Sequence, residues 1–275
     1  MKWINVFVTI SIFLYSFGLE GNAQESVMHK TDSIEQKVLL LEKEIYNARN
    51  ENIKQQLILK KANIFKDAGY TYDAIKTFSR VPYTIANERV AFEALYNLAL
   101  LYYSQDKFET AAQHLSYMES YTPDYVDKPK VLFLGVLINN VMEEFKIARQ
   151  NLKQYAQCCK NDLNVDSVYQ GIDEMKNPEK AKQLSAYLPG LGQFYAGKPW
   201  KGINSFLLNA GFLGYTAYSI YTKMYVIAIF SGLEFLVAFY NGGKRNAQSI
   251  VQRANAKTIE DLNRFLIDWS ESCNH

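Results

Sequence analysis

The amino-acid sequence predicts an all-α protein: an α-solenoid followed by a C-terminal transmembrane helical hairpin and an amphipathic helix. Apolar residues recur 37 residues apart between residues 52 and 160. Two apolar runs, Ile203–Tyr221 and Tyr225–Tyr240, follow, and a three-residue link joins them. The predicted segments are a signal peptide at 1–23, a leader and capping helix at 24–50, the repeats at 51–160, a linker at 161–184, the hairpin at 185–245 and the amphipathic helix at 246–275.

The first 23 residues have the three parts of a secretory signal. Lys2 precedes an apolar stretch from Val6 to Leu19, and the small residues Gly21 and Ala23 follow it. This pattern predicts cleavage after Ala23, with an uncleaved anchor as the alternative. The remaining chain is therefore expected to be exported, with the repeats in the periplasm.

A helix is expected at about 33–49, where Ser33-x-x-Gln36 fits a capping box and Ile34, Val38, Leu41 and Ile45 follow at helical spacing. We expect this helix to cap one end of the repeats.

The repeats show several registers of one period. The aligned positions are Ala74, Ala111 and Ala148; Phe78, Leu115 and Leu152; Ile58, Leu95 and Leu132; and Ala62, Ala99 and Val136. This pattern resembles the tetratricopeptide (TPR) family, in which each repeat is a helix–turn–helix of ~34 residues. The resemblance places Gly69 at a turn and Phe108 and Phe145 at the start of a second helix. Thr71, Asn139 and Lys160 depart from it.

Stacked units of this kind share one core and present a concave face. The resemblance therefore implies binding of a protein or peptide partner, and we expect Tyr96, Asn97, Tyr103 and Asn140 to contact it.

The segment before the hairpin, Leu188–Gly197, reads LPGLGQFYAG. It resembles the LPGxGQxYxG motif that precedes a two-helix membrane domain in bacterial envelope proteins. The residues that match or accompany the motif are Pro189, Gly190, Gly192, Gln193, Tyr195, Gly197, Gly202 and Asn209. The glycines allow a compact turn and close backbone approach. Gln193 and Asn209 are expected to join helices.

Glu234 is a carboxylate inside an apolar run, which by default indicates function. The alternative is a hydrogen bond across the hairpin to Asn209, Tyr215 or Tyr218. Gly211 and Gly214 are expected to let the two hairpin helices approach closely.

Basic residues at both ends of the hairpin conflict with export. If the body is outside, Lys198, Lys201, Lys244 and Arg245 lie on the outer side, against the tendency of Lys and Arg to stay cytoplasmic. A shallow hairpin in one leaflet, a different membrane, or a cytoplasmic body would each resolve the conflict.

The C-terminal segment carries one apolar stripe, from Ile250 through Trp269, with charges opposite. Acidic residues on the polar side favour packing on protein over binding to anionic lipid.

Composition and motifs give no reason to expect an enzyme. The formal net charge of +2 does not favour nucleic acid, and His29, His114 and His275 are isolated in the sequence. The spacing of Cys158, Cys159 and Cys273 matches neither a metal site nor a disulfide framework. We therefore expect no catalytic residue, cofactor or metal, and partners limited to a protein or peptide and membrane lipid.

Two hypotheses follow. The first is a membrane-anchored TPR-like scaffold of the bacterial cell envelope. The second is an accessory factor for membrane protein insertion or transport, in which the hairpin itself is the active module.

Overall fold

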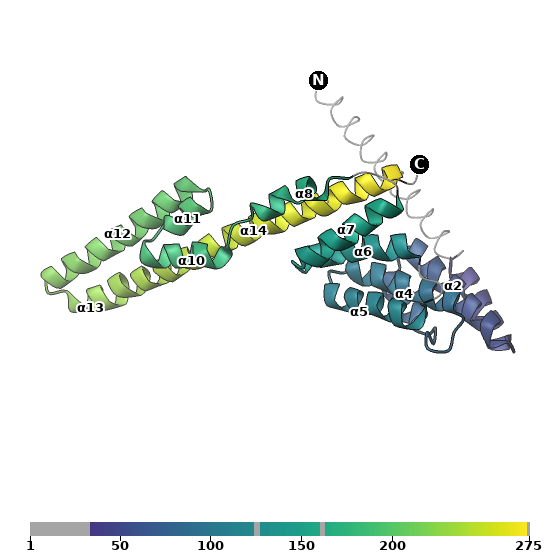
Figure 1. Ribbon diagram of the computed structural model, residues 1–275. Coiled ribbons are helices and arrows are strands. Elements are labelled where there is room, and N and C mark those ends of the chain that lie inside the picture. The colour runs from purple at the N-terminus through teal and green to yellow at the C-terminus, as the bar shows by residue number, and fades with distance from the viewer. Residues whose placement is uncertain (1–33, 124–126, 160–162, 274–275) are drawn as a thin grey trace, which may run out of the picture. The chain divides into compact units, whose positions relative to one another are not determined.

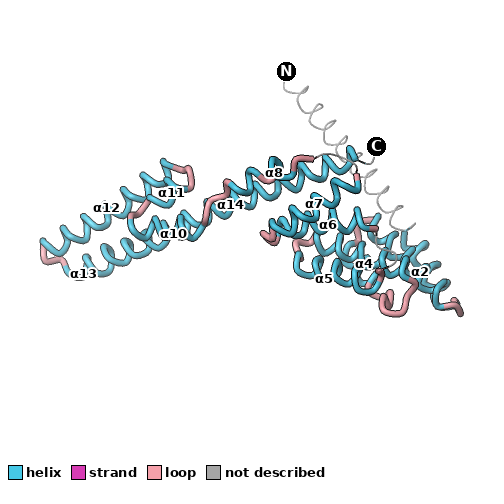
Figure 2. Tube along the Cα trace, in the orientation of Figure 1, coloured by secondary structure: helices cyan, strands magenta, loops and turns pink. Residues whose placement is uncertain are grey.

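The computed structural model describes residues 34–123, 127–159 and 163–273 (Figure 1). All regular elements in these ranges are helices (Figure 2), which confirms the all-α prediction. The predicted signal peptide and Ser33 of the capping box lie outside the described residues. The chain divides into two compact units, with the boundary between Ile138 and Asn139. The boundary falls within helix α6.

The first unit is a set of short helices around one apolar core. It contains a helix over residues 34–47 and the helices α2 (Glu51–Asp67), α3 (Thr71–Phe78), α4 (Glu88–Tyr103), α5 (Phe108–Tyr121) and most of α6 (Lys128–Val141). The side chains of Asn50 and Asn87 accept hydrogen bonds from the first turns of α2 and α4. Each therefore satisfies backbone donors that a helix start leaves unpaired. Ile45, Ile58, Phe78 and Leu98 are among the buried residues of the core.

Three turns of the same geometry recur at the 37-residue period. Gly69, Asp106 and Glu143 have positive φ angles of 80°, 58° and 60°. In each turn the N–H of this residue bonds to the carbonyl three residues back, and the next N–H bonds to the carbonyl five residues before it. This is the Schellman pattern of helix ends. The helices that follow begin at Thr71, Phe108 and Phe145.

The small residues of the predicted registers are fully buried. Ala74, Ala111 and Ala148 have exposed fractions of 0%, as do Ala62 and Ala99. An alanine at a buried contact lets two helices approach closely, so the spacing seen in the sequence matches positions of close packing.

The second unit holds the remaining helices. These are α7 (Phe145–Cys158), α8 (Val165–Val168), α9 (Gln170–Asp173), α10 (Pro178–Tyr187), α11 (Leu191–Tyr195), α12 (Pro199–Tyr221), α13 (Tyr225–Ile227), the π-helix η1 (Ala228–Leu233) and α14 (Glu234–Cys273). The predicted link of the hairpin is confirmed, since α12 ends at Tyr221 and α13 begins at Tyr225. The turn at Lys223 has a φ of 60° and the same Schellman bonds as the turns of the helix pairs.

Helix α14 differs from the expected organisation. We expected a hairpin ending at residue 245 and a separate amphipathic helix over residues 246–275, but α14 runs without a break for 40 residues. A Cβ on Gly243 would lie 2.9 Å from Oγ of Ser205 in α12. The glycine therefore serves close approach to α12 rather than helix termination.

The part of α14 from residue 246 onward packs on protein, as predicted. Ala247 and Val251 form a buried cluster with Ala181 of α10. Further along, the rings of Trp269 and Tyr155 meet edge to face at 5.8 Å. The helix therefore uses its apolar stripe for contacts within the second unit.

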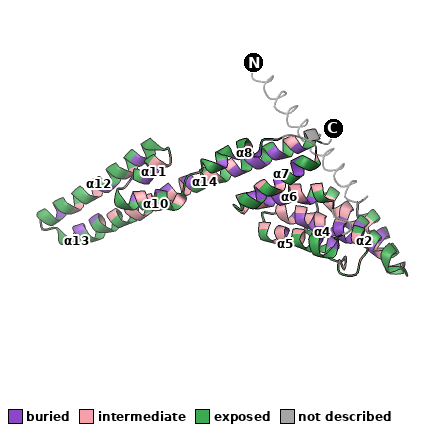
Figure 3. Ribbon diagram, viewed as in Figure 1, coloured by how far each residue is buried: buried purple, intermediate pink, exposed green. Residues whose placement is uncertain are grey.

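Most residues of the hairpin are exposed instead (Figure 3), and many of the exposed ones are large and apolar. Among the described residues, one helical stretch is long and apolar enough to cross a membrane, Tyr225–Glu271. Its apolar 18-residue window has a mean hydropathy of 1.5, and 11% of that window is buried. By length, the sequence predicts that the first apolar run, Ile203–Tyr221, meets the requirement for a membrane span and that the second, Tyr225–Tyr240, falls slightly short. That ranking was wrong, because the second run continues into α14 while α12 carries more polar side chains.

Candidate functional site at the base of the hairpin

The LPGxGQxYxG segment folds into two tight bends around the short helix α11. Gly190 precedes α11 with a φ of +97°, and Gly197 follows it with a φ of +76°. L-amino acids with side chains rarely adopt such angles, so both positions favour glycine. The bends bring α10, α11 and α12 together at the base of the hairpin.

Glycines also allow backbone contacts that a side chain would prevent. A Cβ on Gly192 would lie 2.0 Å from the carbonyl oxygen of Ala181, and one on Gly190 would lie 2.2 Å from that of Gly202. A Cβ on Gly202 would meet the ring of Phe194 at 2.6 Å. The structure therefore supports the expectation that these glycines serve close approach.

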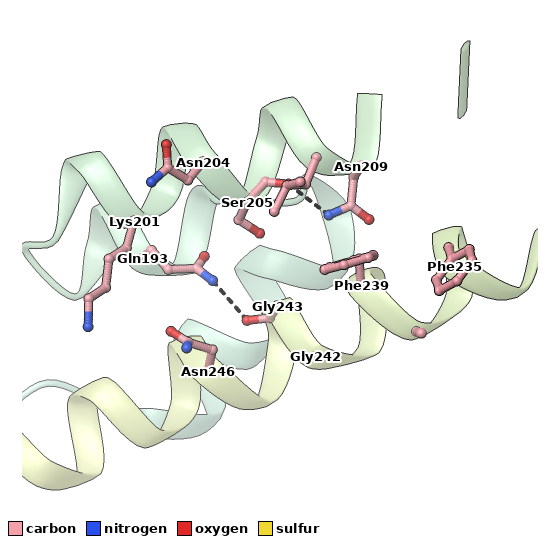
Figure 4. A pocket seen from close by; sticks show the side chains of 12 residues that line it. Gln193, Lys201, Asn204, Ser205, Asn209, Phe235, Phe239, Gly242, Gly243 and Asn246 are labelled. Carbon is pink, nitrogen blue, oxygen red and sulfur yellow. Dashed lines mark hydrogen bonds between the residues drawn. The ribbon is translucent and has the colours of Figure 1, made fainter. Parts of the chain in front are cut away.

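Gln193 connects three helices through its side-chain amide. It has an exposed fraction of 1%. Its Oε1 accepts a hydrogen bond from Oγ of Ser185 in α10 at 3.1 Å, and its Nε2 donates to the carbonyl of Gly243 in α14 at 2.9 Å (Figure 4). Ser185 Oγ in turn accepts from the N–H of Gly192. Gln193 thus joins helices, which is the role expected from the sequence.

Tyr195 fixes the start of α10 to the same base. Its hydroxyl accepts a hydrogen bond from the backbone N–H of Asn177 at 3.1 Å, and its carbonyl accepts one from Nζ of Lys176 at 2.8 Å. The ammonium groups of Lys176 and Lys180 lie 5.6 and 5.5 Å from its ring centroid, within cation–π range. The contacts of Tyr195 are therefore structural.

A cavity of about 610 Å³ opens between α12 and α14 beside Gln193 (Figure 4). Polar residues line its base end and apolar residues its far end; the lining is Gln193, Lys201, Asn204, Ser205, Leu208, Asn209, Phe235, Ala238, Phe239, Gly242, Gly243 and Asn246. Asn209 is 5% exposed, and its Nδ2 donates to the carbonyl of Ser205 at 2.7 Å. Its Oδ1 is buried without a hydrogen-bond partner among the described residues.

Two expectations for the hairpin interior differ from the structure. Glu234 is exposed and makes no hydrogen bond or ion pair within the described residues, so the predicted bond across the hairpin is not formed. Cβ atoms on Gly211 and Gly214 would have no neighbour within 4 Å. Helix approach depends instead on Gly232 in the π-helix, where a Cβ would lie 2.4 Å from Oγ1 of Thr216.

The residues expected to contact a partner have mixed positions. In the first unit, Asn97 is 9% exposed, accepts a hydrogen bond from Nζ of Lys66 and donates to the carbonyl of Glu93. Tyr96 and Tyr103 are partly exposed, and burial raises the pKa of Tyr96. Asn97 is therefore occupied by contacts within its own unit.

Asn140 is fully buried in the second unit and belongs to a polar network. Its Oδ1 accepts a hydrogen bond from the hydroxyl of Tyr169 and its Nδ2 donates to Oδ1 of Asn263, both at 2.7 Å. Burial raises the pKa of Tyr169 to about 12, although Asn140 and the nearby Arg149 act against this shift. The expectation that Asn140 contacts a partner is thus corrected, because its amide is inaccessible.

Sequence reasoning missed Ser185, Tyr169 and Asn263, which complete these two networks. Nothing in their local sequence distinguishes them from ordinary helix residues, because each contact joins segments distant in the chain. Among the described residues no group of three or more His, Cys, Asp or Glu could hold a metal ion.

A scan against protein-family models returns no match, and searches of curated proteins and of solved structures return none either.

Proposed function

We propose that the protein is a membrane-anchored, TPR-like scaffold of the bacterial cell envelope that binds a protein or peptide partner. The observation that carries the proposal is the combination, in one chain, of an outwardly apolar hairpin with helix–turn–helix pairs of a constant period. In this proposal the hairpin attaches the protein to the membrane, and the helix pairs provide the surface that binds the partner. The proposal leaves catalysis out, because no residue constellation supports it.

The dimensions of the hairpin support anchoring. Helix α12 has 23 residues, which corresponds to about 34 Å and exceeds the ~30 Å hydrocarbon core of a bilayer in length, while the helical stretch from Tyr225 is the one that is also apolar enough to cross it. Aromatic residues lie at both ends: Trp200 is 77% exposed at the base, and Tyr221 is 85% exposed at the tip. Such rings favour the two membrane–water interfaces. Between the ends, the outward side chains are largely apolar.

The first unit supplies a partner surface on α5. Tyr117 and Tyr121 are 36% and 40% exposed, and both rings contact Tyr83, at 5.6 and 5.2 Å between centroids. Tyrosines are enriched at protein interfaces because they offer a large, rigid contact area with a polar end. We place the partner at this tyrosine cluster, Tyr83, Tyr117 and Tyr121.

Export is proposed because of the N-terminal signal pattern, whereas the Lys and Arg residues at the base of the hairpin argue against it. Protease accessibility of the repeats in intact spheroplasts distinguishes a periplasmic body from a cytoplasmic one. Digestion of the repeats without lysis supports a periplasmic body. Protection until lysis places the body in the cytoplasm and removes export from the proposal.

Partner binding is tested by pulldown of the full-length chain from detergent extract. The double substitution Tyr117→Ala and Tyr121→Ala is expected to remove a specifically retained protein. Tyr72→Ala is the matched control, since Tyr72 is 74% exposed outside the cluster. Loss of binding in the control, or retention in the double variant, contradicts this placement. A chain that retains no specific protein contradicts the scaffold function.

The alternative, an accessory factor for membrane protein insertion or transport, is favoured by one observation. Glu234 is an exposed carboxylate immediately after the π-helix, within the apolar part of the hairpin. Intramembrane carboxylates and π-helical turns both occur frequently at functional sites. Glu234→Gln with unchanged membrane phenotype argues against this alternative.

A further inference from the structure

The cavity beside Gln193 continues toward the tip of the hairpin. A second cavity of about 480 Å³ is lined by Leu207, Leu208, Gly211, Phe212, Tyr215, Ser231 and Phe235. The two cavities share Leu208 and Phe235 as lining residues, so they form one groove along α12 and α14. From Lys201 to Tyr215 the groove follows α12 for about 21 Å, compared with roughly 15 Å for one leaflet of hydrocarbon.

The groove changes in chemistry along its length. Lys201 and Asn204 of α12 and Asn246 of α14 border its opening at the base (Figure 4). Farther along, Phe239, Phe235 and Leu208 replace them. An occupant that fits must therefore have a polar head at the base and a long apolar part directed toward the tip.

Charge at the opening favours an anionic head. No acidic residue lines either cavity, and Lys201 is the cation at the mouth. The side chains of Lys201, Asn204 and Asn246 have no hydrogen-bond or ion-pair partner within the parts of the chain that are described. They can therefore bind phosphate oxygens without breaking an existing contact.

Small residues explain why the groove is open. Gly211 and Ala238 lie on its two walls, and a Cβ on Gly211 would meet nothing within 4 Å. In a bilayer, water does not fill an apolar recess of this kind, so an acyl chain is the occupant available at that depth.

We propose that this groove binds one acyl chain of an anionic phospholipid, with the lipid phosphate at Lys201, Asn204 and Asn246. The proposal rests on insertion of the hairpin in a bilayer, as proposed above. A bound lipid would fill the space between α12 and α14 and would make hairpin stability depend on lipid composition.

The test uses the full-length chain reconstituted in vesicles of phosphatidylcholine with a minor fraction of phosphatidylglycerol. Native mass spectrometry after release into mild detergent then counts the lipid retained by each protein molecule. The wild-type chain is expected to retain one phosphatidylglycerol in preference to phosphatidylcholine. Lys201→Ala is expected to lower this preference about fivefold, the effect of one basic residue near an anionic surface. Lys198→Ala, which removes a lysine outside the groove, is the control.

Groove-filling variants test the apolar part independently. Ala238→Leu and Gly211→Leu are each expected to abolish retention, whereas Ala217→Leu, at an exposed position of α12 outside the groove, leaves it unchanged. Far-ultraviolet circular dichroism identifies any variant that has lost its helices. Ala238 and Gly211 lie on different helices, so a folding defect in one filled variant leaves the other as a valid test. Equal retention of both lipids by the wild type, or full retention by both filled variants, overturns the proposal.

Two further outcomes are informative. An Ala238→Cys variant that forms a disulfide-linked dimer through this cysteine and retains no lipid also overturns the proposal, because a second copy then occupies the groove. Failure of the wild-type chain to float with vesicles refutes membrane anchoring itself. That result is distinguishable from floating protein that retains no lipid, which refutes only the lipid site.

Discussion

Two glycine substitutions in the second unit should have opposite effects on stability. Gly192 lies in α11 and Gly211 in α12, and both are helical residues. In Gly192→Ala, the new Cβ would lie 2.0 Å from the carbonyl oxygen of Ala181 and 2.4 Å from Oγ of Ser185. In Gly211→Ala, the new Cβ would have no neighbour within 4 Å. Comparison of the two variants therefore distinguishes the effect of close packing on stability from the effect of helix propensity.

The expected magnitudes follow from these distances. A carbon and an oxygen approach to about 3.3 Å in weak contacts, so α10 and α11 must separate by roughly 1.3 Å around Gly192. Overpacking of this kind costs about 1–3 kcal/mol. Separation also breaks the hydrogen bond from Gly192 to Ser185, at about 1 kcal/mol. We expect Gly192→Ala to destabilise the protein by about 2–4 kcal/mol, and Gly211→Ala to stabilise it by about 0.5–1 kcal/mol.

Unfolding of the full-length chain by sodium dodecyl sulfate in mixed micelles, followed by circular dichroism, measures both changes. Each variant is compared with the wild type at the same detergent composition. A Gly192→Ala variant as stable as the wild type would refute the close contact with Ala181. A Gly211→Ala variant that is strongly destabilised would show that α12 packs through a face that the structure leaves open.

Two further predictions concern polar contacts. Tyr169→Phe removes the donor to Asn140 and leaves a buried acceptor unpaired, so it should destabilise the second unit by about 1–3 kcal/mol, measured in the same micelle assay. Burial raises the pKa of Tyr169 to about 12. The stabilising effect of the protonated Tyr169 hydroxyl is therefore complete below the usual pKa of 10.0 and is lost as the pH rises toward 12. Between these pH values the wild type should lose more stability than Tyr169→Phe. Hydrogen bonds from Arg80 and then Lys61 lower the pKa of Glu42 below 4.5. Glu42→Gln should therefore reduce the loss of thermal stability as the pH falls below 4.5, and an unchanged acid profile would contradict this role.

The sequence predicted the elements that depend on local chemistry. Gly69 at a turn, the helix starts at Phe108 and Phe145, and the link after Tyr221 were all expected and are all observed. Each is determined by a few neighbouring residues and by periodic burial. The buried alanines of the repeats were predictable for the same reason, since their spacing recurs along the chain.

The interpretation of isolated glycines was less successful. Gly211 and Gly214 were expected to serve helix packing, and the hairpin was expected to end at residue 245, just after Gly242 and Gly243. In the structure Gly232 and Gly243 make the close contacts with α12, and α14 passes through Gly242 without a break. A glycine allows close approach, positive φ or a helix end equally well. The choice depends on what lies opposite, and a single sequence does not contain that information.

One turn geometry serves both parts of the protein. Gly69, Asp106 and Glu143 join the helix pairs, and Lys223 joins the two helices of the hairpin with the same pattern of backbone hydrogen bonds. This turn satisfies terminal carbonyls of the preceding helix within the chain itself. It therefore needs little help from solvent, which matters more at a membrane surface than in water. At Lys223 a non-glycine residue accepts the strain of positive φ, and in the proposed membrane-anchored state its charge would favour the polar interface. The same turn geometry thus closes the helix pairs and the hairpin, and it does so with different side chains at the left-handed position.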